Sequence, residues 1–349
     1  MASTISQTAI DELTGFLSNF TKTDLENHKQ LSSLSFNTAK EYFYENMRER
    51  RLANATFGFY ESKLRPFEKY LIQIKKKNAL ETVNESEIKY YLHTRYSKHN
   101  VYTQNCSIRA IRAFFNYLER DGHIIANPVS HLKVIKVPRQ KIDYLTIEQI
   151  RKLLTSFDLR KKCEIRNLLI VMILLDTGVR IGELASIKIE DLNFTDKSIY
   201  IYATKTNTFR TVYYSKETER ILNMYKSEIL KSKENGPLFL KFHSYLDIPL
   251  DEVMGKERVQ CWLNKRGKRL FGKDFRLHPH KFRHTFATHF IINGGDPFSL
   301  KDLLGHTSIE TTNIYVDMSY KDLKTKHNNY GIFASVSNGE QKAGVKSEE

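Results

Sequence analysis

The sequence predicts a mainly α protein of two domains: a small all-helical domain, followed by an α+β domain that is helical with a small antiparallel sheet. The chain has 349 residues, of which 40% are hydrophobic and 27% are charged, so it is long enough to build two cores. Over most of its length apolar residues recur every three or four positions, the spacing of amphipathic helices. Residues 198–214 instead contain two β-branched and aromatic runs, a pattern typical of a hairpin.

The N-terminal part of the chain divides into three predicted segments. Residues 1–50 form a helical extension to which the sequence assigns no role, and residues 51–137 form the all-helical domain. Pro66 lies within the first helix of that domain, and we expect it to bend or restart the helix because proline lacks a backbone donor. Residues 138–142 are polar and basic, begin with a proline, and are predicted to be the linker.

The second domain is predicted to span residues 143–334. Thr146 with Gln149 has the spacing of a capping box, which opens a helix at Ile147. Residues 168–175 are apolar on every side, so the helix that contains them should be the buried centre of this domain. Gly178 follows soon after and is expected to end that helix in the left-handed conformation.

The hairpin and the segments after it complete the second domain. Strands are predicted at 198–203 and 210–214, with a short polar turn between them. From Lys216 to about Lys326 the spacing is helical again, interrupted by prolines and by a glycine pair. Residues 335–349 are small and polar and are expected to form a disordered tail.

The composition favours a nucleic-acid partner in a reducing compartment. Lys and Arg total 55 against 40 Asp and Glu, a formal charge of +15 that favours a polyanionic partner. The three cysteines are widely spaced, so neither a disulfide framework nor a structural zinc site is indicated. The longest apolar run falls far short of the roughly 20 residues that a membrane helix needs, so we expect a cytoplasmic protein without a membrane partner.

Four segments of the second domain contain residues suited to phosphate chemistry. Taken singly each is weak evidence, since a lone arginine, lysine or tyrosine usually has a structural role. The four are Thr177–Leu184 with Arg180, the hairpin turn with Lys205, Pro279–His284 with His280 and Arg283, and Leu304–His306 followed by Tyr315.

Together and in this order these segments resemble the catalytic domain of the tyrosine recombinases, the phage-integrase and Xer-like family. The resemblance rests on the arginine motif at Arg180, the HxxR motif at His280 and Arg283, the LGH motif ending at His306, and Tyr315. It implies that residues 51–137 are the core-binding domain, which contacts DNA, and that residues 143–334 are the catalytic domain. It covers nearly the whole chain apart from the first 50 residues and the tail.

The resemblance implies a site-specific DNA recombinase that cleaves and rejoins strands through a 3'-phosphotyrosine intermediate, for integration, excision or resolution of DNA. Tyr315 is then the nucleophile, His280 helps with its proton, and His306 donates a hydrogen bond to the phosphate. Lys205 protonates the departing 5'-oxygen as the general acid. No ATP, cofactor or metal is expected, since the sequence has neither a phosphate-binding glycine loop nor a carboxylate cluster of metal-binding spacing.

Arg180 and Arg283 fit this chemistry on physical grounds. Displacement at a phosphodiester spreads negative charge over the equatorial oxygens, so a protein without a metal must supply fixed positive donors there. A guanidinium stays charged at any working pH and presents paired donors that match phosphate oxygens. Lysine would be a poorer substitute.

The sequence departs from the family pattern in the hairpin, where no glycine flanks Lys205. Lys197 therefore remains an alternative for the general acid. We interpret His284 and His289 as helix residues that pack or form local hydrogen bonds. Glu183 is interpreted as an orienting partner for a buried arginine or histidine, because a buried guanidinium without a carboxylate would be costly.

The resemblance also implies partners: double-stranded DNA, a homo-tetramer that holds two DNA sites together, and accessory proteins as further candidates. The segment from Tyr320 to Tyr330 would pack on a neighbouring subunit; the residues do not show whether it is exchanged. Two alternative functions stay open at this point. One is a type IB topoisomerase, which shares the chemistry but relaxes supercoils, and the other is a DNA-binding protein of the same fold without catalysis.

Overall fold

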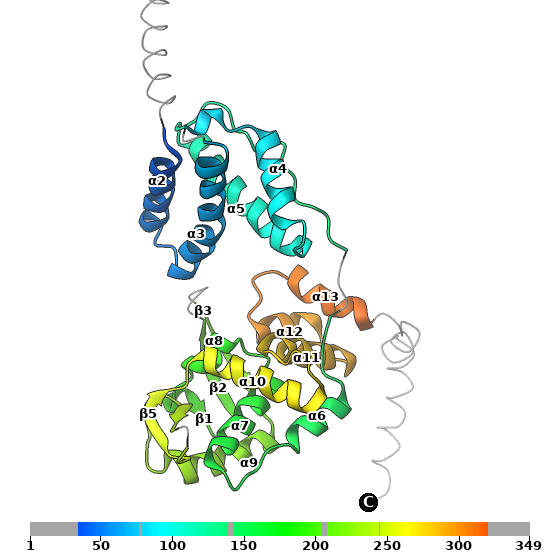
Figure 1. The fold of residues 1–349 in the computed structure, drawn as a ribbon. Helices are drawn as coiled ribbons and strands as arrows, with labels where there is room; N and C mark the ends of the chain where they lie inside the picture. The colour runs from blue at the N-terminus through cyan, green and yellow to red at the C-terminus, as the bar shows by residue number, and fades with distance from the viewer. Residues whose placement is uncertain (1–33, 77–78, 139–141, 204–207, 244, 320–349) are drawn as a thin grey trace, which may run out of the picture. The chain divides into compact units, whose positions relative to one another are not determined.

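The computed structural model describes residues 34–76, 79–138, 142–203, 208–243 and 245–319 (Figure 1). The chain divides into two compact units, residues 1–140 and 141–349. Helices dominate both units, and the named strands all belong to the second. The predicted fold class, mainly helical with a small antiparallel sheet, is therefore confirmed.

Four α-helices and two short turns make up the described part of the first unit. An aromatic cluster joins three of the helices: the Phe36 ring centroid lies 5.7 Å from that of Phe67 and 5.0 Å from that of Phe114. Phe36 belongs to the segment whose role could not be assigned from the sequence, and it is buried in the core of this unit. The elements are α2 (Phe36–Glu49), α3 (Asn54–Lys69), η1 (Tyr70–Ile74), η2 (Leu80–Thr82), α4 (Glu85–Tyr96) and α5 (Val101–Arg120).

The helix that contains Pro66 is neither ended nor restarted at the proline. Pro66 lies inside α3, which continues to Lys69 and then widens into the π-helical turn η1. The helical type thus changes a few residues after the proline, and not at the proline itself. Residues 1–33 of the predicted helical extension lie outside the described residues, as do the tail and the segment after residue 319.

Helix α7 (Lys162–Thr177) is the buried centre of the second unit. Most of its side chains between Ile165 and Leu174 are buried, which confirms the prediction for residues 168–175. Before it, α6 (Ile147–Leu154) begins with the predicted capping box, in which Thr146 and Gln149 exchange side-chain and backbone hydrogen bonds. The predicted positions of these two helices are therefore correct.

A three-stranded antiparallel sheet contains the predicted hairpin. Its strands are β1 (Leu192–Asn193), β2 (Ser198–Ala203) and β3 (Thr208–Tyr213), in the order β1-β2-β3. Ser198 pairs with Tyr213 and Ala203 with Thr208, so residues 204–207 connect the two long strands. Those four residues, Lys205 among them, lie outside the described residues.

A second antiparallel pair, β4 (Leu240–Phe242) with β5 (Pro249–Val253), corrects the prediction of helical spacing over this segment. Leu240 and Phe242 are buried on either side of a partly exposed residue, which is the two-residue period of a strand. A run of three residues is too short for that period to be recognised in a sequence.

Four helices follow and bring the candidate residues together: α10 (Lys256–Phe271), α11 (Pro279–Ile292), α12 (Pro297–Leu304) and α13 (Glu310–Ser319). Helix α11 packs on both α7 and α13, and α12 contacts α11, α13 and β3 (Figure 1). The remaining elements of this unit are α8 (Ile181–Ser186), η3 (Ile189–Asp191), α9 (Lys216–Tyr225) and η4 (Lys226–Leu230). None of the described helices is both long and apolar enough to cross a membrane.

Candidate active site

The first arginine follows a glycine that fixes the end of α7. Gly178 has φ +60°, and a Cβ there would lie 2.6 Å from the Phe286 ring, so both the backbone and the space require glycine. Two residues later Arg180 is extended and precedes α8. Its side chain is 40% exposed, so the guanidinium can reach a ligand from solvent.

A buried carboxylate holds this arginine together with another from the sheet. Glu183 accepts from the Arg180 backbone N–H at 2.8 Å and from Arg180 Nη1 at 3.1 Å. It also accepts from Arg210 Nη1 at 3.1 Å and from Nη2 at 2.6 Å. Burial acts to raise the Glu183 pKa, but the hydrogen bonds from Arg210 and Arg180 outweigh it and leave the pKa lowered. Glu183 is thus an ionised partner of two guanidinium groups.

Arg283 of α11 is buried and bound to two main-chain carbonyls. Nη1 donates to the Gly178 oxygen at 2.9 Å and Nη2 to the Leu304 oxygen at 2.8 Å. Only 5% of the residue is exposed. Burial, followed by the nearby charge of Arg180, lowers the pKa of Arg283 to about 10, so the group is still a cation at neutral pH.

The turn after α12 meets all three arginines. Gly305 has φ +62°, and a Cβ there would lie 3.0 Å from Arg210 Nη1. Arg210 Nε donates to the Leu303 oxygen at 2.9 Å, and Arg180 Nη2 lies 3.4 Å from the Gly305 oxygen. The glycine of the LGH motif therefore leaves room for a guanidinium, and its left-handed backbone ends the helix.

His306 follows this turn and links it to α13. Its Nδ1 lies 2.9 Å from the Thr312 hydroxyl, which is buried. Burial, then the charges of Arg283 and Arg180, lower the His306 pKa to about 4. The imidazole is therefore neutral at neutral pH.

Tyr315 also lies near Arg283, on α13. It is 3% exposed and packs in a small apolar cluster with Ala287, Leu300 and Leu304. Its hydroxyl lies 2.8 Å from His284 Nδ1. Burial raises the Tyr315 pKa, while the charge of Arg283 acts to lower it. The tyrosine and the buried arginine thus affect each other electrostatically, as a nucleophile and a phosphate-binding group would.

His280 occupies a different environment from the other histidines. It is exposed, on the first turn of α11, with its ring centroid 6.5 Å from that of His284. Partial desolvation, then the charges of Arg283 and Arg180, lower its pKa. His280 is thus close enough to both arginines for their charges to lower its pKa.

Of the two lysines considered for the general acid, Lys205 and Lys197, the structure describes only Lys197. Lys205 lies outside the described residues, so its position stays a prediction from the sequence. Lys197 has φ +50° and its Nζ forms an ion pair with Glu219 at 2.6 Å. That lysine is therefore engaged in a local contact.

Two residues at this site were not recognised as site residues from the sequence. His284, which the sequence suggests is a helix residue that packs or forms local hydrogen bonds, contacts the Tyr315 hydroxyl of another helix, and Arg210 links the sheet to Glu183. The sequence carried a signal for the face on which each side chain lies, but not for its partner. His280 and His284 are four residues apart, hence on one helix face, and Arg210 pairs with Ile201, whose side chain is buried.

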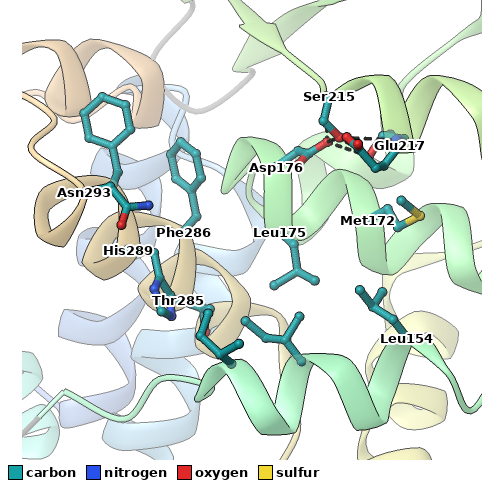
Figure 2. Close-up of a pocket in the computed structure, with 14 residues that line it drawn as sticks. Leu154, Met172, Leu175, Asp176, Ser215, Glu217, Thr285, Phe286, His289 and Asn293 are labelled. Atoms are coloured by element: carbon teal, nitrogen blue, oxygen red, sulfur yellow. Dashed lines mark hydrogen bonds between the residues drawn. The ribbon is translucent and has the colours of Figure 1, made fainter.

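A separate pocket of about 510 Å³ lies between α6, α7, α11 and the start of α9 (Figure 2). Its wall is mainly apolar, with Met172, Leu175 and Phe286 among the lining residues. His289 also lines it, and its Nε2 lies 3.3 Å from the Leu145 oxygen. None of the candidate catalytic residues that the structure describes lines this pocket.

Comparison with known proteins decides the family. The phage integrase family matches residues 143–322, slightly more than half of the chain and the whole of the site described above. The chain belongs to this family. The phage integrase N-terminal SAM-like domain matches residues 39–122 of this tyrosine recombinase, within its first unit.

Two curated relatives of this tyrosine recombinase align over most of both chains. A tyrosine recombinase of Pseudothermotoga lettingae is 30% identical over 277 residues, which covers 77% of this chain and 90% of the relative. Tyrosine recombinase XerD of Listeria monocytogenes is 29% identical and covers 79% and 92%. The predicted family and enzyme class, a tyrosine recombinase, are thus confirmed.

Solved structures support the fold. XerH site-specific recombinase bound to its difH substrate has a TM-score of 0.62 at 21% identity, covering 82% of each chain. A lambda integrase dimer bound to a COC' core site has a TM-score of 0.65 at 18% identity, covering 88% of this chain and 85% of the other. At such identities the likeness concerns the fold alone.

Proposed function

We propose that this recombinase binds double-stranded DNA at a specific site, cleaves one strand with Tyr315 and rejoins it to a second strand. The observation that supports this most directly is the convergence of Arg180, Arg283 and Arg210 on one turn, with Tyr315 beside them. Glu183 is the carboxylate paired with these arginines and balances one of the three positive charges, so a bound anion would offset the remaining excess. A scissile phosphate is the anion that a tyrosine nucleophile requires.

Arg180 and Arg283 would bind the two non-bridging oxygens of that phosphate. Arg283 is fixed by two carbonyls, so its remaining donors need no reorganisation when charge develops on phosphorus. Arg180 is partly exposed and would approach from the solvent side. His306, neutral at working pH, would donate a hydrogen bond to the same group, and His280 is a further donor at its edge.

The reaction exchanges one phosphoester for another. The Tyr315 oxygen would attack phosphorus, the bond to the 5'-oxygen would break, and a 3'-phosphotyrosine would form. The departing 5'-oxygen would take a proton from Lys205, the proposed general acid. Rejoining is the same step in reverse, so the ester energy is retained and no ATP is required.

DNA exchange between two sites would need four such subunits, two on each duplex. We propose a homo-tetramer on synapsed sites, acting in integration, excision or resolution, with accessory proteins as further candidate partners. The formal charge of +15 supports binding to the DNA backbone. Affinity should then fall by about 0.9 logarithmic units per neutralised phosphate for each tenfold rise in salt.

A covalent-trapping experiment tests this function and identifies the target sequence at the same time. The probe is a pool of end-labelled duplexes of random sequence that each contain one nick, which lets the freed end diffuse away. We expect the protein to form an adduct that survives a denaturing gel, and sequencing the trapped DNA should yield one consensus. Tyr315→Phe should form no adduct while binding the consensus duplex equally well.

Tyr213→Phe is the matched control, because Tyr213 is an exposed tyrosine of β3. It should form adducts like the unaltered protein. An adduct from Tyr315→Phe would refute the nucleophile. Sequence-selective binding to duplexes of the pool without any adduct would favour a DNA-binding protein without catalysis, and plasmid relaxation without sequence preference would favour a topoisomerase.

A further inference from the structure

His284 is placed directly against the reacting atom of the proposed nucleophile. It lies in α11, one residue after the buried Arg283, so its backbone position is fixed by the same helix. Its Nδ1 is 2.8 Å from the Tyr315 hydroxyl, and the two ring centroids are 5.8 Å apart. Because Tyr315 is only 3% exposed, solvent cannot readily replace this contact. The nucleophilic oxygen therefore has one defined hydrogen-bond partner among the described residues.

His280, to which the family resemblance assigned the tyrosine proton, has no such contact. No hydrogen bond joins it to Tyr315 among the described residues, and its side chain is exposed. A general base must be within hydrogen-bond reach of the proton that it removes. By that criterion His284 is the better candidate.

We propose that His284 is the catalytic residue that accepts the Tyr315 proton during cleavage and returns it during rejoining. The proposal rests on the function proposed above. In cleavage the O–H bond of Tyr315 breaks, its proton binds Nδ1, the phenolic oxygen forms its bond to phosphorus, and the bond from phosphorus to the 5'-oxygen breaks as that oxygen takes a proton from the general acid. In rejoining the 5'-hydroxyl returns its proton to the deprotonated general acid and attacks phosphorus, the bond from phosphorus to the Tyr315 oxygen breaks, and His284 gives its proton back to that oxygen.

The surroundings of His284 keep this proton on the tyrosine until DNA arrives. Burial, then the charges of His280, His278 and Arg283, lower the His284 pKa, with only Asp143 acting in the opposite direction. The ring is therefore neutral at neutral pH, as an acceptor must be, and the buried phenol, whose pKa is raised, holds its proton. No phenolate forms in the free protein.

A bound phosphate would make His284 a stronger proton acceptor. Its negative charge would lie against the arginines and offset their repulsion of a protonated imidazole. His284 would then become more basic as the substrate binds. The negative charge of the bound phosphate would thus prepare His284 to accept the Tyr315 proton only when a DNA strand lies in the site.

The test is the pH profile of single-turnover cleavage, measured with the nicked consensus duplex recovered from the trapping experiment. His284→Ala should lower the cleavage rate at pH 7.5 by about 100-fold or more, the range typical of a general base. His284→Asn keeps a hydrogen-bond acceptor near the Nδ1 position but cannot take a proton, so it should remain about equally slow. His289→Gln, altered on the same helix away from the tyrosine, should cleave at the unaltered rate.

The decline of the cleavage rate at low pH, the acid limb of the profile, distinguishes a base role of His284 from a positioning role. In the unaltered protein cleavage should decline at acid pH, where His284 gains a proton and can no longer accept one from Tyr315. His284→Asn should lack this decline, whereas His280→Asn should keep it.

Several outcomes would overturn the proposal. If His284→Asn cleaves at the full rate and its cleavage still declines at acid pH, His284 only positions the tyrosine. If His284→Ala cleaves faster than the unaltered protein, His284 holds Tyr315 back and does not act as a base. Loss of the limb in His280→Asn would return the role to His280. If the unaltered protein forms no adduct with any duplex of the pool, the proposed function fails first, and the role of His284 fails with it.

Discussion

The two sides of the candidate site are built differently. On the arginine side, Arg283 donates to two carbonyls, and a buried carboxylate joins Arg180 to Arg210. On the tyrosine side, Tyr315 has one side-chain hydrogen bond among the described residues and a small apolar cluster around its ring. The first side is fixed by charged hydrogen bonds in several directions, whereas the second depends on packing and on one neutral contact.

This difference matches the two tasks of a strand-cleaving site. Donors that stabilise a developing charge are most effective when they need no reorganisation, which explains a network with many fixed contacts. A nucleophile must meet phosphorus at the correct distance and then move with it, because the new bond lies on the tyrosine itself. Since the tyrosine is buried in the free protein, the proposed attack would require DNA binding to open its surroundings, and a cluster of few apolar residues would keep the free-energy cost of that opening small.

The largest effect of breaking the arginine side should come from Arg283→Lys. Lysine keeps a positive charge but cannot donate to the Gly178 and Leu304 carbonyls while also holding a phosphate in the same plane. We expect single-turnover cleavage to fall about 10²–10³-fold, the range for loss of a fixed donor at a charged transition state. Quenched-flow measurement of adduct formation on the nicked consensus duplex checks this.

Arg160→Lys is the matched control, because Arg160 is exposed and forms its ion pair with a near neighbour, Asp158. It should leave cleavage unchanged. Cleavage within about threefold of the unaltered rate in Arg283→Lys would show that charge alone suffices, and the fixed network would then be a structural feature only.

The sequence predicted one side of the site better than the other. Arg180, Arg283 and the glycine turns stand in short motifs with fixed local geometry, since a left-handed glycine cap can be recognised from neighbouring residues. The Tyr315–His284 contact joins two helices with a third between them in the chain, and no local spacing encodes it. Arg210 illustrates the same limit, as its partner Glu183 is distant in sequence.

The same reasoning explains what was predicted of the fold. Long periodic segments such as α7 and the β2–β3 hairpin were found from their patterns, because many residues repeat the same signal. The short pair β4–β5 was missed because its strands have three and five residues. The role of Lys205 beside the phosphate stays a prediction, since this residue falls outside the described ones.

A smaller effect should follow from Glu183→Gln, which leaves the two guanidiniums without their anion. Arg210 is 11% exposed at its side chain, so its charge would remain buried without compensation. We expect a loss of about 3–5 kcal/mol in the free energy of unfolding, measured by urea denaturation, because a buried charge loses its partner. Cleavage should also slow as Arg180 loses its orientation.

Glu190→Gln is the control for the lost carboxylate, because Glu190 is exposed and contacts Lys188 and a backbone donor at the surface. It should change stability by less than about 0.5 kcal/mol. Equal denaturation midpoints for the two variants would contradict the view that Glu183 holds the arginine side together.

The smallest effect concerns His306, where the arginine side meets α13 through Thr312. Its pKa is lowered to about 4 in the folded protein, by burial first and then by Arg283, against about 6.5 in an unfolded chain. Between these values the unfolded chain binds a proton that the folded protein does not, so stability is lost as the pH falls from about 6.5 toward about 4.

His306→Asn removes this titration. The unaltered protein should therefore be the more stable of the two at pH 7, through the hydrogen bond to Thr312, and its advantage should shrink at pH 5. Urea midpoints at both pH values measure it. A constant difference would mean that burial and the arginines do not hold the imidazole neutral in the folded protein.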